Sequence, residues 1–233
     1  CVFAFNYTIK IYANQGKEEK AFALFNQMSE CGVSPNQVTY TAILSMLFKI
    51  KDGVQVGKKL HVYIRFYGSF NNDVILGTSL LNMYGKCDRL CDAEKVFDAM
   101  IEKNLVTWTT LISLYTYHGE RNRAFQAFSL LFLQGLLPNR VSFLTMLSAC
   151  KDPMCLADGK RIHATIVCNE AQQDISIMNA LVNMYGKCGS IKDALHIFHI
   201  IQQRDLISWS AMVSVYAKHG HDKASFHMFR NMQ

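Results

Sequence analysis

The hexapeptide Asn82-Met-Tyr-Gly-Lys-Cys87 decides the fold, because it returns unchanged as Asn183-Met-Tyr-Gly-Lys-Cys188, 101 residues later. Three pairs of single residues keep this spacing: Phe97 and Phe198, Trp108 and Trp209, and Gly119 and Gly220. Two further pairs are 102 and 103 residues apart, namely Gly57-Lys58 with Gly159-Lys160 and Pro35-Asn36 with Pro138-Asn139. Self-similarity at a nearly fixed spacing is typical of a repeat architecture, and the small differences indicate short insertions.

Each copy divides into shorter segments of similar length. The segments open with aromatic and apolar stretches at seven positions: Val2, Gln37, Val74, Leu105, Arg140, Ile175 and Leu206. Successive openings lie 35, 37, 31, 35, 35 and 31 residues apart, and the last segment has 28 residues. Two helices of about 11 to 14 residues, with their turns, need about this many residues. Every segment therefore predicts one pair of helices.

Glycines mark the turns that we expect between paired helices. Gly16, Gly119 and Gly220 recur between a tyrosine and an alanine, where left-handed backbone ends a helix. In the segment 74–104, apolar residues at helical spacing stop at Gly85, which we interpret as a turn. A sustained alternation of apolar and polar residues is missing, which disfavours a β fold. Because one helical hairpin cannot bury its apolar face alone, we expect stacked hairpins with a concave and a convex wall.

The composition is that of a folded chain. Of 233 residues, 50% are hydrophobic and 18% are charged, with three prolines, which excludes a disordered tail or a collagen-like fibre. The net charge of +6 permits a polyanionic partner without requiring one. The longest apolar runs are far shorter than the roughly 20 residues that span a bilayer. Because the chain begins at Cys1 and not at a methionine, we expect an internal piece whose targeting peptide lies outside this sequence.

The eight cysteines form no metal or redox motif. They stand at positions 1, 31, 87, 91, 150, 155, 168 and 188 without a Cys-x-x-Cys pair, which argues against a zinc ribbon or a thioredoxin motif. We predict free thiols that act as small buried apolar residues in a reducing compartment. His196 and His199 could share a helix face near Cys188, but no third ligand supports a metal site. We predict no metal and no cofactor.

No catalytic constellation is found in the sequence. The stretch Gly53-x-x-x-Gly57-Lys58-Lys59 is one residue shorter than a phosphate-binding loop and lacks its Ser or Thr. The zinc deaminase signature and the Gly-x-Ser-x-Gly elbow are also missing. We therefore predict that the chain is not an enzyme and has no small-molecule substrate. Four recurring aromatic residues are predicted to be core and not stacking platforms: Tyr84, Trp108, Tyr185 and Trp209.

Several blocks of the sequence resemble plant pentatricopeptide repeat proteins. These are the openings Val2–Asn6, Leu105–Thr109 and Leu206–Ser210, the endings Gly32–Asn36 and Gly135–Asn139, and the Met-Tyr-Gly-Lys-Cys blocks. The alternating lengths resemble the PLS subfamily, in which standard, long and short repeats alternate. The resemblance implies an all-α fold, a right-handed α-solenoid of about seven helix-turn-helix repeats. The implied repeats are 2–36 (P type), 37–73 (L type), 74–104 (S type), 105–139 (P type), 140–174 (L type), 175–205 (S type) and 206–233 (truncated P type).

The resemblance also implies sequence-specific binding of single-stranded RNA in a mitochondrion or chloroplast, often to direct cytidine-to-uridine editing. Editing-complex proteins or a deaminase domain are the further partners it suggests, and no membrane is involved. In this family the fifth and last residues of a repeat read one base. The pairs are Asn6/Asn36, Thr41/Asp73, Thr78/Asn104, Thr109/Asn139, Leu144/Asp174 and Asn179/Asp205, with Ser210 alone in the last repeat. The second residues, which sandwich the base, are Phe3, Val38, Ile75, Val106, Val141, Ser176 and Ile207.

The family's code turns these pairs into an expected RNA tract. From 5′ to 3′ it is a pyrimidine, a weakly assigned G, A, A, an unreadable base, U and a purine. Leu144 cannot hydrogen-bond and Ser176 is not apolar, so both depart from the pattern. Phosphate contact is implied at the thirteenth residue of four segments: Lys49, Lys86, Lys187 and Lys218. The equivalent Asn14, Tyr117 and Asp152 do not fit.

One alternative of a different class is a tetratricopeptide-like scaffold that binds a peptide. It would use the same hairpin architecture with a 34-residue unit. The alternation of segment lengths argues against it.

Overall fold

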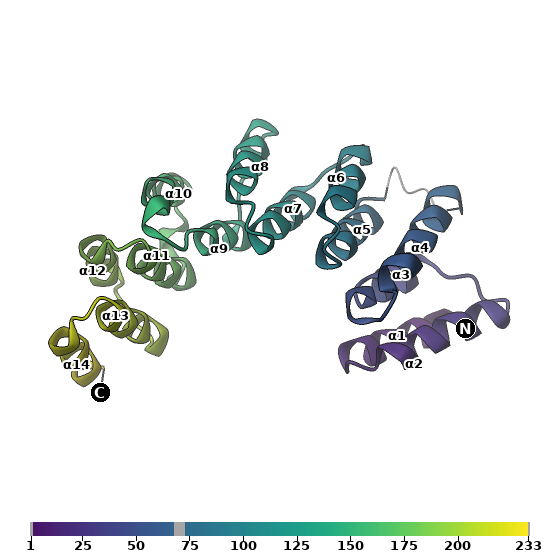
Figure 1. The fold of residues 1–233 in the computed structure, drawn as a ribbon, viewed down its shortest axis with the longest axis horizontal. Coiled ribbons are helices and arrows are strands. Elements are labelled where there is room, and N and C mark those ends of the chain that lie inside the picture. The colour runs from purple at the N-terminus through teal and green to yellow at the C-terminus, as the bar shows by residue number, and fades with distance from the viewer. Residues whose placement is uncertain (1, 68–72, 233) are drawn as a thin grey trace. The chain divides into compact units, whose positions relative to one another are not determined.

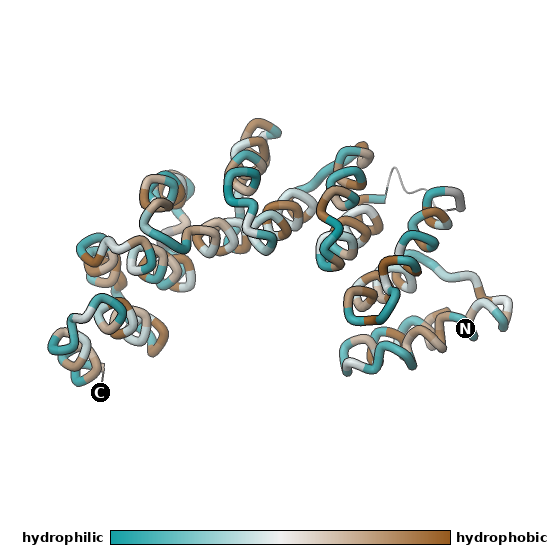
Figure 2. Tube along the Cα trace, in the orientation of Figure 1, coloured by the Kyte–Doolittle hydropathy of each residue, from teal (hydrophilic) through white to brown (hydrophobic). Residues whose placement is uncertain are grey.

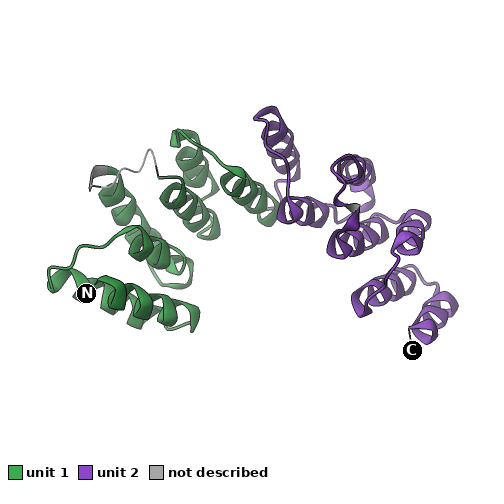
Figure 3. Ribbon diagram, turned by 180° about the vertical axis from the view of Figure 1, so that it is seen from behind, with its two compact units in different colours: residues 1–118 green, residues 119–233 purple. Residues whose placement is uncertain are grey.

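The computed structural model describes residues 2–67 and 73–232, so Cys1, Gln233 and part of the predicted repeat 37–73 lie outside the described residues. The chain divides into two compact units, residues 1–118 and residues 119–233 (Figure 3). Both units consist of α-helices, turns and short 3₁₀ helices, and the described part of the chain contains no strand. The predicted all-α class is therefore confirmed.

The helices of each unit follow one another along the chain, joined by turns and short loops (Figure 1). Unit 1 contains α1 (Val2–Asn14), α2 (Glu18–Glu30), α3 (Gln37–Leu44), α4 (Gly53–Tyr67), α5 (Val74–Lys86), α6 (Leu90–Ala99) and α7 (Leu105–Tyr117). Unit 2 contains α8 (Arg121–Leu133), α9 (Arg140–Ala149), α10 (Leu156–Cys168), α11 (Ile175–Lys187), α12 (Ile191–Ile200), α13 (Leu206–Lys218) and α14 (Asp222–Asn231). Short 3₁₀ helices span Leu47–Lys49, Pro153–Cys155 and Ala171–Gln173.

The helices that open the segments, which we call first helices, lie side by side within each unit. In unit 1, α3 contacts α1 and α5, and α5 contacts α7; in unit 2, α11 contacts α9 and α13. Their buried faces are apolar, with Ile9, Ile43 and Leu80 fully buried in unit 1 and Met146 and Leu181 in unit 2. Figure 2 shows hydrophobic and hydrophilic residues on different sides of the helices, as this packing requires. Stacked hairpins are the arrangement expected of a solenoid.

Every first helix from α3 onward begins directly after an asparagine or aspartate. These six residues are Asn36, Asp73, Asn104, Asn139, Asp174 and Asp205. The side-chain oxygen of each accepts a hydrogen bond from a backbone N–H two or three residues later. Such a cap stabilises a helix by about 1 kcal/mol. Six of the seven segment openings thus follow a strong helix-start signal.

The glycine predictions have two different outcomes. Gly16, Gly119 and Gly220 have φ of +69°, +75° and +71° at the ends of α1, α7 and α13, so the predicted left-handed turns are confirmed. The turn predicted at Gly85 is wrong, because Gly85 lies inside α5 and is buried. A Cβ there would collide with the Leu114 side chain of α7. The absence of a side chain lets the two helices approach each other, and the left-handed residue after α5 is Asp88.

Cysteine burial is mixed. Among the described residues, all seven cysteines are free thiols, as predicted. Only Cys150, Cys155 and Cys188 are buried, whereas Cys31, Cys91 and Cys168 are exposed, so the expectation of buried thiols holds for part of the set. Burial raises the pKa of the Cys150 thiol to about 12.

The recurring aromatic residues are core residues in three of four cases. Tyr84, Trp108 and Tyr185 are buried, while Trp209 is half-buried. Trp108 packs edge-on against Phe97, with ring centroids 4.8 Å apart. The Tyr84 and Tyr185 hydroxyls lie 3.1 and 2.9 Å from Nδ1 of His61 and His163, and burial of these histidines lowers their pKa. None of the helices in the described part of the chain has the length and apolar character needed to cross a membrane.

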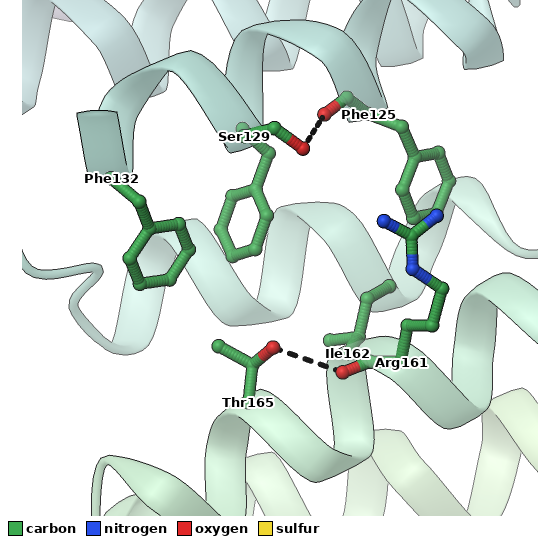
Figure 4. A pocket seen from close by; sticks show the side chains of 7 residues that line it. Phe125, Ser129, Phe132, Arg161, Ile162 and Thr165 are labelled. Atoms are coloured by element: carbon green, nitrogen blue, oxygen red, sulfur yellow. Dashed lines mark hydrogen bonds between the residues drawn. The ribbon is translucent and has the colours of Figure 1, made fainter.

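A cavity of about 260 Å³ lies between α8 and α10 in unit 2 (Figure 4). It is lined by Phe125, Phe128, Ser129, Phe132, Arg161, Ile162 and Thr165. The hydroxyls of Ser129 and Thr165 donate to carbonyls of their own helices, those of Phe125 and Arg161. The remaining lining is therefore mainly aromatic.

Candidate functional site

The first predicted pair, Asn6 and Asn36, is joined by a hydrogen bond. Nδ2 of Asn6 on α1 donates to Oδ1 of Asn36 at 3.0 Å. The same Asn36 oxygen caps α3 by accepting from the backbone N–H of Thr39 at 3.2 Å. The Thr39 hydroxyl lies 2.5 Å from Oδ1 of Asn6. One polar cluster thus connects the fifth residue of a segment, its last residue and the next first helix.

The pair Thr78 and Asn104 meets in the same way through a hydroxyl. The Thr107 hydroxyl lies 2.9 Å from the Thr78 hydroxyl and 3.1 Å from Oδ1 of Asn104. Asn104 caps α7 by accepting from the backbone N–H of Thr107 at 3.0 Å. Thr107 therefore bridges the two predicted readers.

In unit 2, the pair Asn179 and Asp205 is also joined. Nδ2 of Asn179 donates to Oδ1 of Asp205 at 3.1 Å, and Ser208 donates its backbone N–H and its hydroxyl to the same oxygen at 2.7 and 2.8 Å. The Ser208 bonds are the main reason why the pKa of Asp205 lies below its ordinary value. Oδ1 of Asn179 is buried and has no partner.

The two pairs of the predicted L-type repeats are arranged differently. The Thr41 hydroxyl donates back to the carbonyl of Gln37 at 2.8 Å, while the Gln37 amide donates to both carboxylate oxygens of Asp73 at 2.9 Å. In unit 2, Arg140 Nε lies 3.4 Å from Oδ2 of Asp174. Gln37 and Arg140 are both first residues of their helices. In these repeats the last residue thus binds the first residue of its own repeat.

The remaining predicted readers differ in their surroundings. Thr109 is buried in unit 1, and Asn139 in unit 2 caps α9 by accepting from Ser142 at 3.0 Å. Ser210 is exposed, and its hydroxyl donates to the Leu206 carbonyl at 2.7 Å.

Burial varies within both kinds of reader. Of the fifth residues, Asn6 and Thr109 are 7% exposed and Asn179 is 4% exposed, whereas Ser210 is exposed. Of the last residues, the asparagines Asn36, Asn104 and Asn139 are exposed, whereas the aspartates Asp73, Asp174 and Asp205 are half-buried.

The predicted sandwiching residues are exposed although they are apolar. Six of them keep between 50% and 84% of their surface exposed: Phe3, Val38, Ile75, Val106, Val141 and Ile207. Each lies in the first turn of a first helix, three residues before the predicted fifth-position reader. Such an exposed apolar side chain is found in six of the seven first helices, whereas α11 has Ser176 at this position.

The four predicted phosphate-contacting lysines fall into two groups. Lys86, Lys187 and Lys218 are exposed last residues of α5, α11 and α13. Lys49 instead lies in a 3₁₀ helix, because α3 ends at Leu44, and its Nζ is 3.2 Å from a carboxylate oxygen of Glu18. In unit 2, Asp152 stands at the position of Lys49 and Arg121 at the position of Glu18, so the two charges are exchanged. A guanidinium nitrogen of Arg121 lies 3.9 Å from Oδ1 of Asp152.

Sequence reasoning missed Glu18 and the hydroxyls of Thr39, Thr107, Ser142 and Ser208. The signal for the hydroxyls is present, because each follows an asparagine or aspartate by three residues, as in a capping box. In the described residues, no group of three His, Cys, Asp or Glu side chains is placed to hold a metal ion.

Family models match along both units. The model described as PPR repeat family matches residues 1–49, the pentatricopeptide repeat domain model matches residues 94–152, and the PPR repeat model matches residues 78–105, 176–206 and 207–233.

Curated relatives come from Arabidopsis thaliana. One pentatricopeptide repeat-containing protein named as chloroplastic is 33% identical over 205 residues, covering 88% of this chain and 25% of the relative. Another named as mitochondrial is 31% identical over 193 residues, covering 83% of this chain and 19% of the relative. The chain thus spans a quarter or less of the length of these two relatives.

Solved structures share the fold. The pentatricopeptide repeat protein PPR10 in complex with an 18-nt psaJ RNA element matches all of this chain and 35% of its own, with a TM-score of 0.77 and 21% identity. A structure of PPR10 from maize matches with a TM-score of 0.61 and 22% identity, over 100% of this chain and 38% of that chain.

Proposed function

Because this chain belongs to the pentatricopeptide repeat family, we propose that it binds single-stranded RNA in a sequence-specific manner, one base per repeat. The proposed setting is a chloroplast or mitochondrion, in agreement with the names of its relatives. The finer proposal is that the chain is the recognition part of a cytidine-to-uridine editing factor of the PLS type. It rests on the alternating segment lengths and on the resemblance described above.

The observation that carries the proposal is the exposed apolar side chain in the first turn of successive first helices. Apolar side chains stabilise the faces of an unstacked base, whereas a neighbouring polar group binds its edge. Ile75 on α5 and Val106 on α7 belong to adjacent, contacting helices of unit 1, and both are more than half exposed. A base between two such residues would meet the Thr78 and Asn104 cluster at its edge.

The capping bond provides a physical reason for base choice. Oδ1 of Asn36 accepts from the backbone N–H of Thr39, which leaves Nδ2 as its remaining hydrogen-bonding group, a donor. A carboxylate such as Asp205 has only acceptors. Last-position Asn therefore suits bases with a ring acceptor, A and C, while Asp suits bases with a ring N–H, U and G.

The proposed cations of the site are Lys86, Lys187 and Lys218. Each ends a first helix and is exposed, where it could meet a phosphate. Lys49 contributes less in this proposal, because Glu18 already neutralises part of its charge.

The test compares a seven-nucleotide RNA of the expected tract with an RNA of the same composition in scrambled order. We expect tighter binding of the first, with an affinity that falls by about 0.7 decade per decade of salt for each neutralised phosphate. The variant pair Asn179→Thr with Asp205→Asn should move the preference at the sixth nucleotide from U to A, while preferences at the third and fourth nucleotides stay unchanged. Equal affinity for both RNAs at moderate salt would refute the proposed function.

A further inference from the structure

The third residue of a first helix follows a pattern across the chain. It is a serine or threonine in the helix that follows each predicted P- or S-type repeat, and these four residues are fully buried: Thr39, Thr107, Ser142 and Ser208. It is Leu76 or Ile177 in the helix that follows a predicted L-type repeat. We propose that the residue with this buried hydroxyl is a specificity-determining positioning residue. Reader pairs that contact the hydroxyl discriminate between bases, and the two pairs without it discriminate only weakly. This inference rests on the proposed function.

The Thr39 hydroxyl lies between the two readers of the repeat before it. Its oxygen is 2.5 Å from Oδ1 of Asn6 and 3.1 Å from Oδ1 of Asn36, and it accepts the backbone N–H of Asn36 at 3.1 Å. Because Asn36 uses Oδ1 to cap α3, its amide orientation is fixed by the backbone. Asn6 is then fixed from both sides, with Nδ2 toward Asn36 and Oδ1 toward Thr39.

This fixed orientation matters for recognition because a primary amide has two different ends. Rotating the amide of Asn6 by half a turn would exchange its donor for its acceptor and invert the base that it prefers. The rotated amide would direct Nδ2 at the Thr39 hydroxyl and Oδ1 at an oxygen of Asn36, leaving a buried acceptor without a donor. Burial makes such a mismatch costly. The bond from the Thr39 hydroxyl to Oδ1 of Asn6 thus adds to the preference for the orientation that the Asn36 oxygen already favours.

The threonine reader Thr78 gains the same constraint. A free Thr78 hydroxyl could rotate to donate or to accept. Its hydrogen bond with the Thr107 hydroxyl at 2.9 Å limits this rotation. Thr107 also reaches Asn104 at 3.1 Å, so the three side chains form one chain of hydrogen bonds. In unit 2, Ser208 holds the Asp205 oxygen that orients Asn179.

The predicted L-type pairs lack this constraint and carry a competitor. Leu76 and Ile177 have no hydroxyl, so nothing at the third position bridges Thr41 to Asp73 or Leu144 to Asp174. Both oxygens of Asp73 instead accept from Gln37 at 2.9 Å. A base that approached Asp73 would have to displace this amide. The second and fifth nucleotides are accordingly the ones that we infer to be read weakly.

The experiment removes one hydroxyl without changing side-chain shape. The full-length chain with Thr107→Val is compared with the unmodified chain. Binding of each is measured to four RNAs that differ only at the third nucleotide. We expect the preference for A there to fall by about tenfold, toward equal affinity for all four bases. Thr107→Ser restores the hydroxyl and should restore the preference. The fourth and sixth nucleotides serve as internal references, because their preferences should not change.

A matched control separates positioning from helix stability. Thr110 lies one turn later on α7 and donates to the Val106 carbonyl, so Thr110→Val removes a hydroxyl that does not touch the readers. Melting temperatures of all variants are measured, and Ser208→Ala, read at the sixth nucleotide, replaces Thr107→Val if that variant does not fold. Unchanged discrimination in a folded Thr107→Val variant overturns this inference and leaves RNA binding intact. Failure of the unmodified protein to prefer the expected RNA overturns the proposed function instead.

Discussion

Filling the cavity between α8 and α10 with an aromatic ring should stabilise unit 2. Unit 1 holds the matching position, since Tyr63 stands where unit 2 has Thr165, 102 residues later, the same spacing as between the two Gly-Lys pairs. The Tyr63 ring packs on Tyr40, with centroids 6.0 Å apart, and Tyr40 corresponds to Phe143. The variant Thr165→Tyr should therefore place a ring in the cavity beside Phe128 and Phe143.

The magnitude follows from the area that the ring would bury. Tyr63 is 46% exposed, so a tyrosine in this setting buries about half of its roughly 200 Å². At about 25 cal/mol per Å² the gain has an upper limit of about 2.5 kcal/mol. Losing the rotamer freedom of the ring costs about 1 kcal/mol. We expect a net stabilisation of about 1.5 kcal/mol, which is about a tenfold change in an opening equilibrium.

The assay is native-state hydrogen exchange, because stacked repeats open locally and need not unfold as one unit. Amides of α8 and α10 should exchange about tenfold more slowly in Thr165→Tyr, whereas Thr165→Val, which brings no ring, should leave them nearly unchanged. The reciprocal Tyr63→Thr should speed exchange in α2 and α4. Unchanged or faster exchange in α8 and α10 of Thr165→Tyr would refute the equivalence of the two positions.

Two further predictions concern buried groups of unit 2. Burial lowers the pKa of His163 in the folded chain. As the pH falls below about 6.5, the unfolded chain therefore takes up a proton first, and the free energy of unfolding decreases until the pH reaches the folded-state pKa. The urea midpoint should be lower at pH 5.5 than at pH 7.5, and His163→Gln should reduce this difference. Gly186→Ala should destabilise by about 1–3 kcal/mol, because its Cβ meets Val215, and Val215→Ala in the same chain should recover part of the loss in a urea titration. A fully additive double variant would contradict the contact.

Helix starts could be predicted from sequence because the signals are local. Asn36, Asn104 and Asn139 each precede an apolar run, and the first helices begin at the next residue. The same holds for the turn at Gly119, whose left-handed backbone favours glycine. These features depend on a few neighbouring residues, which the sequence shows directly.

Contacts between hairpins could not be predicted because they depend on residues about 30 positions apart. In the sequence, Gly85 cannot be distinguished from a glycine in a turn. Only the position of Leu114 on α7 shows that Gly85 provides space between two helices. Lys49 matched a phosphate position by count, but the early end of α3 moves it to Glu18. The Thr39 hydroxyl has a visible capping signal, whereas its bond to Asn6 exists only after α1 and α3 stack.

The six capping residues limit how this protein's specificity could evolve. Each of these side chains starts a helix and, in the proposed function, also faces a nucleotide. A mutation that changes the target sequence through this position must retain a good helix cap, and few amino acids satisfy that demand. Helix capping thus restricts which amino acids can occupy this position. In the proposed function, a change of target sequence then comes mainly from exchanges between asparagine and aspartate here, or from substitution of the fifth residue.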